Sequence, residues 1–488
     1  MEDYTRHLVG NEWVRGSGGE YESINPFTRS AWAVHTHASE ADVSRAVAAA
    51  RSAFPAWRQT SGYDRARLIL RLADLMERDI DRLAELETRD NGKIVRENKN
   101  QIAFAARIYR FFAGLADKLN GETKPLDNYD TVDYTVREPL GVCALITAWN
   151  SPLQLLANKL PPALAAGNTA VIKPSEFTGV STLALGELIL EAGFPPGVIN
   201  VITGAAGTGA ALTSHPNIDK ISFTGGVETA RLIAANAAAH MTPATYELGG
   251  KSANIIFPDA NLDRAIPGAV SGIFAAAGQT CVAGSRLVVH ADLYDEVVEA
   301  VAKRAQLVRL GDPMDAQTQM GPLAHSGHLT RVQRAIADAL EDGARLVTGG
   351  APPPGLEDTL FMAPTVFADV TSGMRLAQQE VFGPVLAVQR FHTDSEAIEI
   401  ANGTRYALAS GLWSGDITRA HRVAKELRAG TCWINTYRTS AAQAPFGGFR
   451  NSGYGRERGT DGILEYTTTK NTMIDLSTAV RDPFVLGR

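Results

Sequence analysis

The chain has 488 residues, of which 45% are hydrophobic and 20% charged, and its formal net charge is −6. This length exceeds one ordinary hydrophobic core and predicts two or three domains. No cluster of lysine and arginine stands out, so nucleic acid is not expected as the main partner.

The three cysteines, Cys143, Cys281 and Cys432, are odd in number and far apart. They show no metal-binding spacing, and the ten histidines show none either, so neither a disulfide framework nor a metal is expected. The first residues are polar and acidic and lack a secretory segment. We therefore expect a reduced, cytoplasmic setting, in which a free thiol stays usable.

The uncharged run Pro139–Asn158 is long enough to suggest a membrane span. Asn150, Pro152 and Gln154 interrupt it with polar groups and a ring that breaks helices. We interpret the run as a buried strand, a turn and the start of a helix, and we expect no membrane partner.

Helices are predicted early in the chain. Ser39 has the pattern of an N-cap, followed by acids in the first turn of a helix that runs toward Trp57. A second amphipathic pattern surrounds Leu72, and a third spans roughly residues 97–119. We expect these helices to be scaffold.

Thr131–Glu138 alternates between apolar and polar side chains and predicts a half-buried strand. A regular alternation of strands and helices follows, which predicts a parallel sheet with helices on both faces. The predicted strands are Val142–Thr147, Thr169–Lys173, Val198–Ile202 and Lys220–Phe223. The predicted helices are Pro152–Ala165, Gly179–Ala192, Gly207–Ser214 and Val227–Ala239.

Ligands bind such sheets at the carboxyl ends of the strands. Asn150, Lys173, Glu176 and Thr224–Gly226 follow the ends of predicted strands. A second α/β unit is predicted from about residue 250, with a helix at residues 262–277 and a strand at residues 286–290. Residues 465–476 have β character and end the pattern.

Cys281 lies in an uncharged run, Ile266–Ser285, where a thiol is most often a small buried hydrophobe. Glu247 and Asn150 occur in polar motifs upstream. Together the three residues offer a nucleophile, a base and an amide donor, which is a set that covalent acyl chemistry requires.

Seven stretches in order resemble the NAD(P)-dependent aldehyde dehydrogenase family over nearly the whole chain. They are ITAWNSP (146–152), KPSE (173–176), FTGG (223–226), ELGGKS (247–252), GQTC (278–281), EVFGP (380–384) and PFGGFRNSGYGRE (445–457). The resemblance implies an α/β fold with three parts: a Rossmann-like NAD-binding domain at residues 1–120 and 140–248, a catalytic domain at 249–455, and a small β oligomerisation arm at 121–139 and 456–488.

The resemblance also implies a mechanism of the hydrolytic type. The Cys281 thiolate would attack the aldehyde, the Asn150 amide and the Cys281 N–H would stabilise the oxyanion, and Glu247 would activate water against the thioester. Each residue has a structural alternative: Asn150 as a helix cap, and Glu247 as a surface acid before a glycine turn.

For the cofactor, the glycine-rich turn before a helix at residue 227 predicts a pyrophosphate cradle. A carboxylate at Glu176 would repel a 2′-phosphate, which favours NAD, whereas Lys173 leaves NADP possible. The resemblance assigns these residues to the cofactor: Lys173, Glu176, Thr224, Gly225, Gly226, Trp149, Leu248, Glu380 and Phe382.

The substrate pocket implied by the resemblance comprises Ser151, Leu155, Thr280, Ser440 and Phe446. Ser151 and Asn158 replace aromatic residues common in hydrolytic members, so we expect a bulky or oxygenated aldehyde. Arg438 has two interpretations, a contact with a substrate carboxylate or, more commonly, a solvated surface arginine. Thr460 stands where some members carry a proton-relaying acid.

Two alternatives remain open. A CoA-acylating relative would pass the acyl group to CoA, although such members tend to lack the base at Glu247. A non-enzymatic NAD-binding relative would keep the fold without turnover. The family's β arm implies a homodimer or homotetramer.

Overall fold

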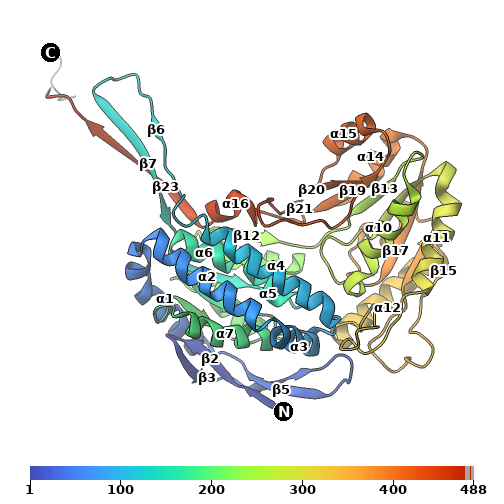
Figure 1. The fold of residues 1–488 in the computed structure, drawn as a ribbon, viewed down its shortest axis with the longest axis horizontal. Coiled ribbons are helices and arrows are strands. Elements are labelled where there is room, and N and C mark those ends of the chain that lie inside the picture. Colours follow the sequence, from blue (N-terminus) through green and yellow to red (C-terminus); the bar gives the residue numbers. More distant parts are fainter. Residues whose placement is uncertain (479–483, 485–488) are drawn as a thin grey trace.

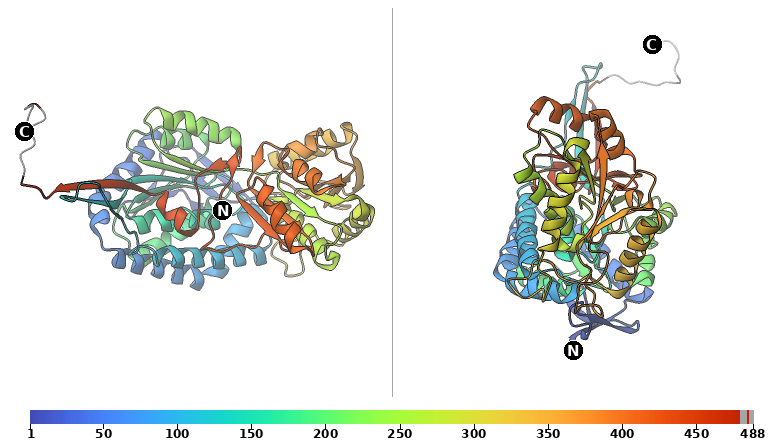
Figure 2. Two further views of the ribbon diagram at one scale, coloured as in Figure 1. Left: turned by 90° about the horizontal axis from the view of Figure 1, so that it is seen from above. Right: turned by 90° about the vertical axis from the view of Figure 1, so that its right-hand side faces the viewer.

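The computed structural model describes residues 1–478 and residue 484. Two α/β units lie side by side, and a narrow β arm projects from the first of them (Figure 1). Seen from above, the arm extends away from the second unit (Figure 2). No helix among the described residues is long and apolar enough to cross a membrane.

The first unit is built on an eight-stranded sheet with the order β22-β12-β11-β8-β9-β10-β2-β3. The five central strands are parallel, whereas β22 and β2 pair antiparallel with the two ends of this set and β3 pairs antiparallel with β2 at the edge. The strands are β2 (Arg6–Val9), β3 (Glu12–Arg15), β8 (Val142–Ile146), β9 (Thr169–Lys173), β10 (Ile199–Val201), β11 (Lys220–Thr224), β12 (Ala244–Glu247) and β22 (Gly453–Tyr454). The predicted parallel sheet is therefore confirmed.

Helices cover both faces of this sheet, and the alternation of side chains along β8 shows why. Cys143 and Leu145 pack on one face with α2–α7, whereas Val142 and Ala144 pack on the other with α1, α8 and α9. The helices are α1 (Glu40–Gln59), α2 (Gly62–Arg78), α3 (Ile80–Asn91), α4 (Val95–Ala113), α5 (Pro152–Ala157), α6 (Leu160–Ala166), α7 (Val180–Ala192), α8 (Ala206–Thr213) and α9 (Val227–Ala238). β1 (Glu2–Tyr4), β4 (Glu20–Ile24) and β5 (Ala31–Thr36) form a small separate sheet.

Two helix predictions in this unit were wrong in detail, and one helix was missed. The stretch predicted as one helix from Pro152 breaks into α5 and α6, because the rings of Pro161 and Pro162 remove two backbone N–H donors. The third predicted helix begins at Val95 and ends at Ala113, earlier than residue 119. The helix α3 was not predicted.

The second unit contains a seven-stranded sheet with the order β15-β16-β17-β14-β13-β19-β20. Its strands are β13 (Ala253–Ile256), β14 (Arg286–His290), β15 (Arg345–Thr348), β16 (Thr365–Ala368), β17 (Val385–Phe391), β19 (Ala409–Trp413) and β20 (Thr431–Ile434). The helices α10 (Leu262–Phe274), α11 (Tyr294–Gln306) and α12 (Ser326–Glu341) cover one face, and α14 (Asp394–Asn402) and α15 (Ile417–Glu426) cover the other. Short elements complete the unit: α13 (Arg375–Gln378), β18 (Tyr406–Ala407) and β21 (Phe449–Arg450).

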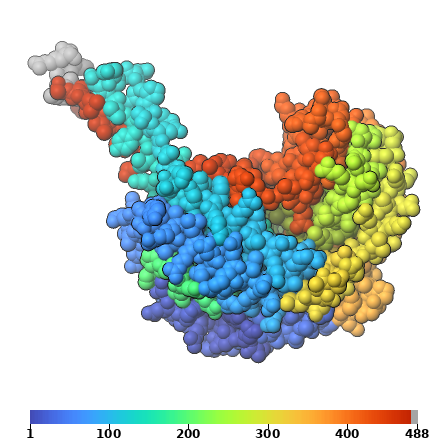
Figure 3. Space-filling model, in the orientation of Figure 1, coloured from blue at the N-terminus to red at the C-terminus, as the bar shows by residue number. Residues whose placement is uncertain are grey.

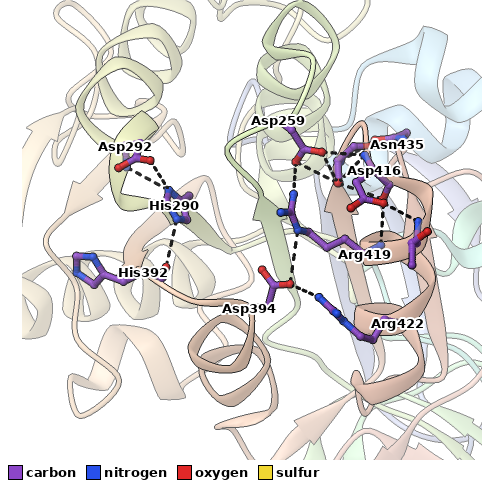
Figure 4. Close-up of polar contacts among 11 residues, drawn as sticks. Asp259, His290, Asp292, His392, Asp394, Asp416, Arg419, Arg422 and Asn435 are labelled. Carbon is purple, nitrogen blue, oxygen red and sulfur yellow. Dashed lines mark hydrogen bonds and ion pairs between the residues drawn. The ribbon is translucent and has the colours of Figure 1, made fainter.

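Ion pairs fix the outer face of the second unit (Figure 4). Arg419 lies between two carboxylates, 2.7 Å from Asp259 and 3.5 Å from Asp394, and Arg422 pairs with Asp394 at 2.6 Å. Nearby, the Asn435 side chain donates to the carbonyl oxygen of Ser414 at 2.9 Å. These contacts anchor the start of the loop that follows β20.

The arm is a three-stranded sheet of β6 (Thr123–Lys124), β7 (Thr131–Pro139) and β23 (Thr467–Asp475), with β7 in the centre. β7 confirms the predicted strand. Its apolar side chains are exposed on this chain, at 39% for Val132, 37% for Tyr134 and 37% for Val136. The segment with β21 and α16 (Gly459–Leu464) crosses the floor of a hollow between the arm and the second unit (Figures 1 and 3).

Candidate active site

A cavity of about 590 Å³ is lined by residues of both units. Eleven of the residues predicted for the site line it: Trp149, Asn150, Leu155, Thr224, Gly225, Gly226, Glu247, Leu248, Cys281, Glu380 and Phe382. Parallel strands explain this convergence, because the loops after β8, β11 and β12 leave the same edge of one sheet.

A turn of unusual backbone geometry positions Cys281. The helix predicted to reach Ala277 ends at Phe274, because Ala276 and Ala277 adopt left-handed conformations with φ of 56° and 53°. Gly278 follows with φ of 71°, and a Cβ there would lie 2.1 Å from the carbonyl oxygen of Gly383. Such strained backbone is maintained by its surroundings and is concentrated at functional sites.

The Cys281 side chain is half-buried and its thiol is free. Desolvation raises the pKa of Cys281 to about 12, and the charges of Glu247 and Glu380 add to that rise. Arg458 and Arg438 act in the opposite direction. The thiol is therefore protonated at rest and needs a base before it can act as a nucleophile.

Asn150 follows β8 and reaches the turn that carries the thiol. Its Nδ2 donates to the carbonyl oxygen of Gln279 at 3.0 Å, two residues before Cys281. The helix-cap alternative is wrong, because the N-cap of α5 is Ser151 and that cap has no side-chain hydrogen bond.

A buried lysine holds the loop on which Asn150 lies. Lys93 is 3% exposed, and its Nζ donates to the backbone carbonyl of Asn150, to the Ser151 hydroxyl at 2.8 Å and to Gln101 Oε1 at 2.8 Å. Desolvation lowers the pKa of Lys93 to about 8, against the charges of Glu87 and Glu97. No sequence pattern connects Lys93 with this loop.

Glu247 ends β12 and is 3% exposed, so the surface-acid alternative is wrong. Neither carboxylate oxygen has a hydrogen-bond partner among the described residues. Burial raises the pKa of Glu247 well above its usual range, and the neighbouring charge of Glu457 raises it further. A carboxyl group with a raised pKa next to a thiol is suited to general-base work near neutral pH.

The cradle predicted for a pyrophosphate lies between β11 and α9. Gly226 is the N-cap of α9, and a Cβ there would meet nothing within 4 Å. The Thr224 hydroxyl is buried without a hydrogen-bond partner among the described residues. Free N–H groups of a twelve-residue helix and an unpaired hydroxyl therefore face open space, as an anion site requires.

Glu380 lies across the cavity against the ELGGKS turn. Its Oε1 accepts from the Gly250 N–H at 3.0 Å, and a Cβ at Gly249 would lie 1.9 Å from its Oε2. Burial raises the pKa of Glu380 to about 7. Phe382 has φ of 59°, and its carbonyl oxygen lies 2.8 Å from His328 Nε2, which donates to it.

Six predicted site residues do not line this cavity: Lys173, Glu176, Ser151, Thr280, Ser440 and Phe446. Lys173 is buried, and its Nζ donates to the carbonyl oxygen of Pro174 at 3.1 Å. Ser440 and Phe446 both contact Arg458.

Among the lining residues that the prediction missed are four with basic side chains: His328, Arg331 and Arg334 on α12, and Arg375 at the start of α13. The three-residue spacing of Arg331 and Arg334 on one helix was the only available signal. It could not be connected with the glycine turn 100 residues earlier without the fold.

Comparisons with known proteins identify the family to which the chain belongs. A model of the aldehyde dehydrogenase family matches residues 13–472. The chain is 45% identical to a protein of Acinetobacter baylyi named (Z)-2-((N-methylformamido)methylene)-5-hydroxybutyrolactone dehydrogenase, over 100% of both chains. It is 43% identical to the betaine aldehyde dehydrogenase of Bacillus subtilis, over 95% of this chain and 96% of that protein.

Among solved structures, betaine aldehyde dehydrogenase from Staphylococcus aureus in complex with NAD+ superposes with a TM-score of 0.97. That protein is 39% identical, and the alignment covers 99% of this chain and 97% of that one. The chain therefore belongs to the aldehyde dehydrogenase family, a family of enzymes. The predicted family and α/β fold class are confirmed.

Proposed function

We propose that the protein oxidises an aldehyde to the carboxylic acid with NAD, through a thioester on Cys281. The convergence of Cys281, Glu247 and Asn150 on one cavity carries this proposal. The named relatives act on aldehydes or related oxygenated compounds, and a structural neighbour was solved with NAD+.

The residues present fit a dinucleotide. The α9 N-terminus, the open space at Gly226 and the unpaired Thr224 hydroxyl would hold its pyrophosphate. Glu380 and Phe382 would lie beside the nicotinamide end, and Glu176 favours NAD over NADP. When bound, NAD supplies the acceptor for the hydride that leaves the reacting carbon.

The chain's own residues perform the remaining steps. Glu247 takes the thiol proton, and Cys281 Sγ adds to the aldehyde carbon. The Asn150 amide and the Cys281 N–H donate to the oxygen that becomes negative, which typically contributes about a hundred- to a thousand-fold in rate per donor. Glu247 then releases the thiol proton to solvent. After oxidation it takes a proton from the water that attacks the thioester, the Cys281 thiolate is expelled, and the acid leaves.

The proposal also covers the assembly of the enzyme and its cellular setting. The exposed apolar face of β7 supports assembly into a homodimer or homotetramer through the arm. The free thiols support a reducing, cytoplasmic setting. The domain boundaries at residues 120, 140, 248 and 455 remain predictions; β22 at residues 453–454 pairs with the first sheet.

Two variants test the function and separate it from CoA acylation. With NAD and a panel of aldehydes, Cys281→Ala should lose at least about a thousand-fold in kcat/KM while still binding NAD. Glu247→Gln should form at most one equivalent of reduced nicotinamide per active site, slowly because the thiol has lost its base, and then stall at the thioester because water has no base either. Formation of acyl-CoA in preference to free acid, when CoA is added to the wild type, would overturn the hydrolytic proposal. NAD binding without turnover of any aldehyde would favour the non-enzymatic alternative.

A further inference from the structure

One buried cation, Arg458, forms no ion pair among the residues that the structure describes. Arg458 is 7% exposed, and its side chain makes two hydrogen bonds, both to neutral groups. Nε donates to Asn158 Oδ1 at 3.0 Å, and Nη1 donates to the Ser440 hydroxyl. The adjacent carboxylate, Glu457, forms its ion pair with Lys159 instead. Among the described residues, no carboxylate pairs with Arg458.

Aromatic rings hold this guanidinium in one place. Its carbon lies 5.1 Å from the centre of the Phe104 ring and 5.0 Å from the centre of the Phe446 ring. Cation–π contacts of this kind orient the planar group but do not neutralise its charge. Two of its five N–H groups have partners, so the group keeps donors available for a ligand.

The charge of this guanidinium acts on both reacting groups, lowering the pKa of Cys281 and of Glu247, although Arg458 is not among the residues that line the cavity. Phe446 precedes Gly447, at which a Cβ would lie 2.7 Å from Glu247 Oε1. Asn158 lies one helical turn after Leu155, which lines the cavity with Cys281. The pKa of Cys281 is also lowered by the charge of Arg438, which likewise has no ion pair among the described residues.

We propose that Arg458 recognises an anionic group, a carboxylate, at the far end of the aldehyde substrate. A buried guanidinium without a counter-ion is unfavourable in the free enzyme, and a substrate carboxylate would satisfy it with paired hydrogen bonds. The proposal rests on the proposed aldehyde oxidation. It also separates this chain from relatives named for betaine aldehyde, because a quaternary ammonium would be repelled by the Arg458 guanidinium.

Matched pairs of aldehydes that differ only in charge test the proposal. The anionic set is 4-oxobutanoate, 5-oxopentanoate and 6-oxohexanoate, each compared with its neutral methyl ester. The cationic pair is betaine aldehyde and its neutral isostere 3,3-dimethylbutanal. For at least one chain length, the anion should have a kcat/KM at least about tenfold above that of its ester, and betaine aldehyde should fall below its isostere.

Variants assign the preference to Arg458. Arg458→Gln should abolish the advantage of the anion over the ester, measured as the ratio of their two kcat/KM values in the same protein, and Arg458→Lys should keep part of that ratio. The control is Arg422→Gln, at an exposed arginine on α15. This variant should leave kcat/KM for both the anion and the ester unchanged. Equal kcat/KM for acid and ester at all three lengths, or an advantage that persists in Arg458→Gln, would overturn the proposal and leave Arg458 as a structural cation.

A binding measurement tests the anion site independently of the proposed aldehyde oxidation. Titration calorimetry with 4-hydroxybutanoate and with its neutral amide, 4-hydroxybutanamide, compares a ligand that has a carboxylate with one that has none, without turnover. Tighter binding of the anion to the wild type, lost in Arg458→Gln, would support the anion site even if no aldehyde were oxidised. Equal binding of the anion and the amide by the wild type would count against the site, whether or not aldehydes react.

Discussion

At the scale of single residues, this active site is distinguished by buried charges whose partners come from distant segments. Glu247 has no hydrogen-bond partner among the described residues, Lys93 is bound by neutral oxygens, and Arg458 lacks a counter-ion. Each arrangement costs folding free energy, since a buried ionised group is stable only when its surroundings compensate it. Because burial shifts the pKa values of such groups, the pH dependence of stability and activity tests their surroundings.

The first prediction concerns Glu247 and stability. Its folded pKa lies above that of the unfolded chain, so its contribution to stability is fully present below the unfolded pKa and is lost as pH rises through the folded pKa. A glutamine does not titrate. The free energy of unfolding of Glu247→Gln, relative to wild type, should therefore be more favourable at pH 8 than at pH 4.5 by on the order of 1 kcal/mol.

Urea unfolding of both proteins at the two pH values measures this difference. Glu85→Gln, an exposed site on α3, is the matched control and should show no such change. A Glu247→Gln difference that is the same at both pH values would show that the carboxyl is not perturbed in the folded enzyme.

The second prediction concerns Lys93 as a positioning residue for Asn150. Lys93→Met removes the ammonium that fixes the Asn150 carbonyl, so kcat/KM for aldehydes should fall about ten- to a hundred-fold while NAD binding is unchanged. In the wild type, kcat/KM should also decline as pH rises above about 8, where Lys93 loses its proton.

Lys99→Met provides the control, because Lys99 pairs with Asp81 at 2.7 Å on the exposed surface. Steady-state kinetics and NAD titration give both quantities. If Lys93→Met kept the wild-type kcat/KM, the position of Asn150 would not depend on this lysine.

At the scale of helices and strands, local sequence signals predicted element boundaries correctly at a helix N-cap and at the two ends of a strand. Ser39 caps α1 as predicted, with Asp42 completing a capping box. The strand Thr169–Lys173 begins and ends as expected. The end of α10 could not be predicted, because the left-handed turn at Ala276 is imposed by the packing of Gly278 against Gly383 and not by residue type.

The third prediction tests the cap of α1. The Ser39 hydroxyl accepts from the Asp42 N–H at 3.2 Å, and Asp42 Oδ2 accepts from the Ser39 N–H at 3.0 Å. Ser39→Ala should lower the free energy of unfolding by about 1 kcal/mol. Ser52→Ala, at an exposed position of the same helix, should leave it nearly unchanged. Equal effects of the two changes in urea unfolding would contradict a capping role.

At the scale of the whole molecule, the sequence predicted the two α/β units and the residues at strand ends, because strands of a parallel sheet present their carboxyl ends at one edge. It did not predict the approach of Lys93 to Asn150, 57 residues apart, or of Arg458 to Asn158, 300 residues apart. Such contacts depend on how helices and returning segments pack, and no local pattern encodes them.

The fourth prediction concerns assembly. Val132 and Val136 expose apolar surface on the central strand of the arm, as an interface between copies requires. Replacing both by lysine should shift the protein to monomers in sedimentation velocity, while Leu340→Lys, at an exposed apolar site on α12, should not. Unchanged sedimentation of the arm variant would exclude this face from the interface.

The pairing of β22 with β12 has a consequence for biosynthesis. Gly453 lies opposite Glu247, the Ser452 hydroxyl donates to the Gly249 carbonyl at 2.8 Å, and Glu457 binds Lys159. During synthesis, β12 and Glu247 at its end leave the ribosome before residues 452–457. Until those residues also emerge, β12 can form, but Glu247 remains uncovered. The cofactor cradle is thus complete roughly 230 residues before the environment of the base, and reactivity of the thiol is coupled to completion of the chain.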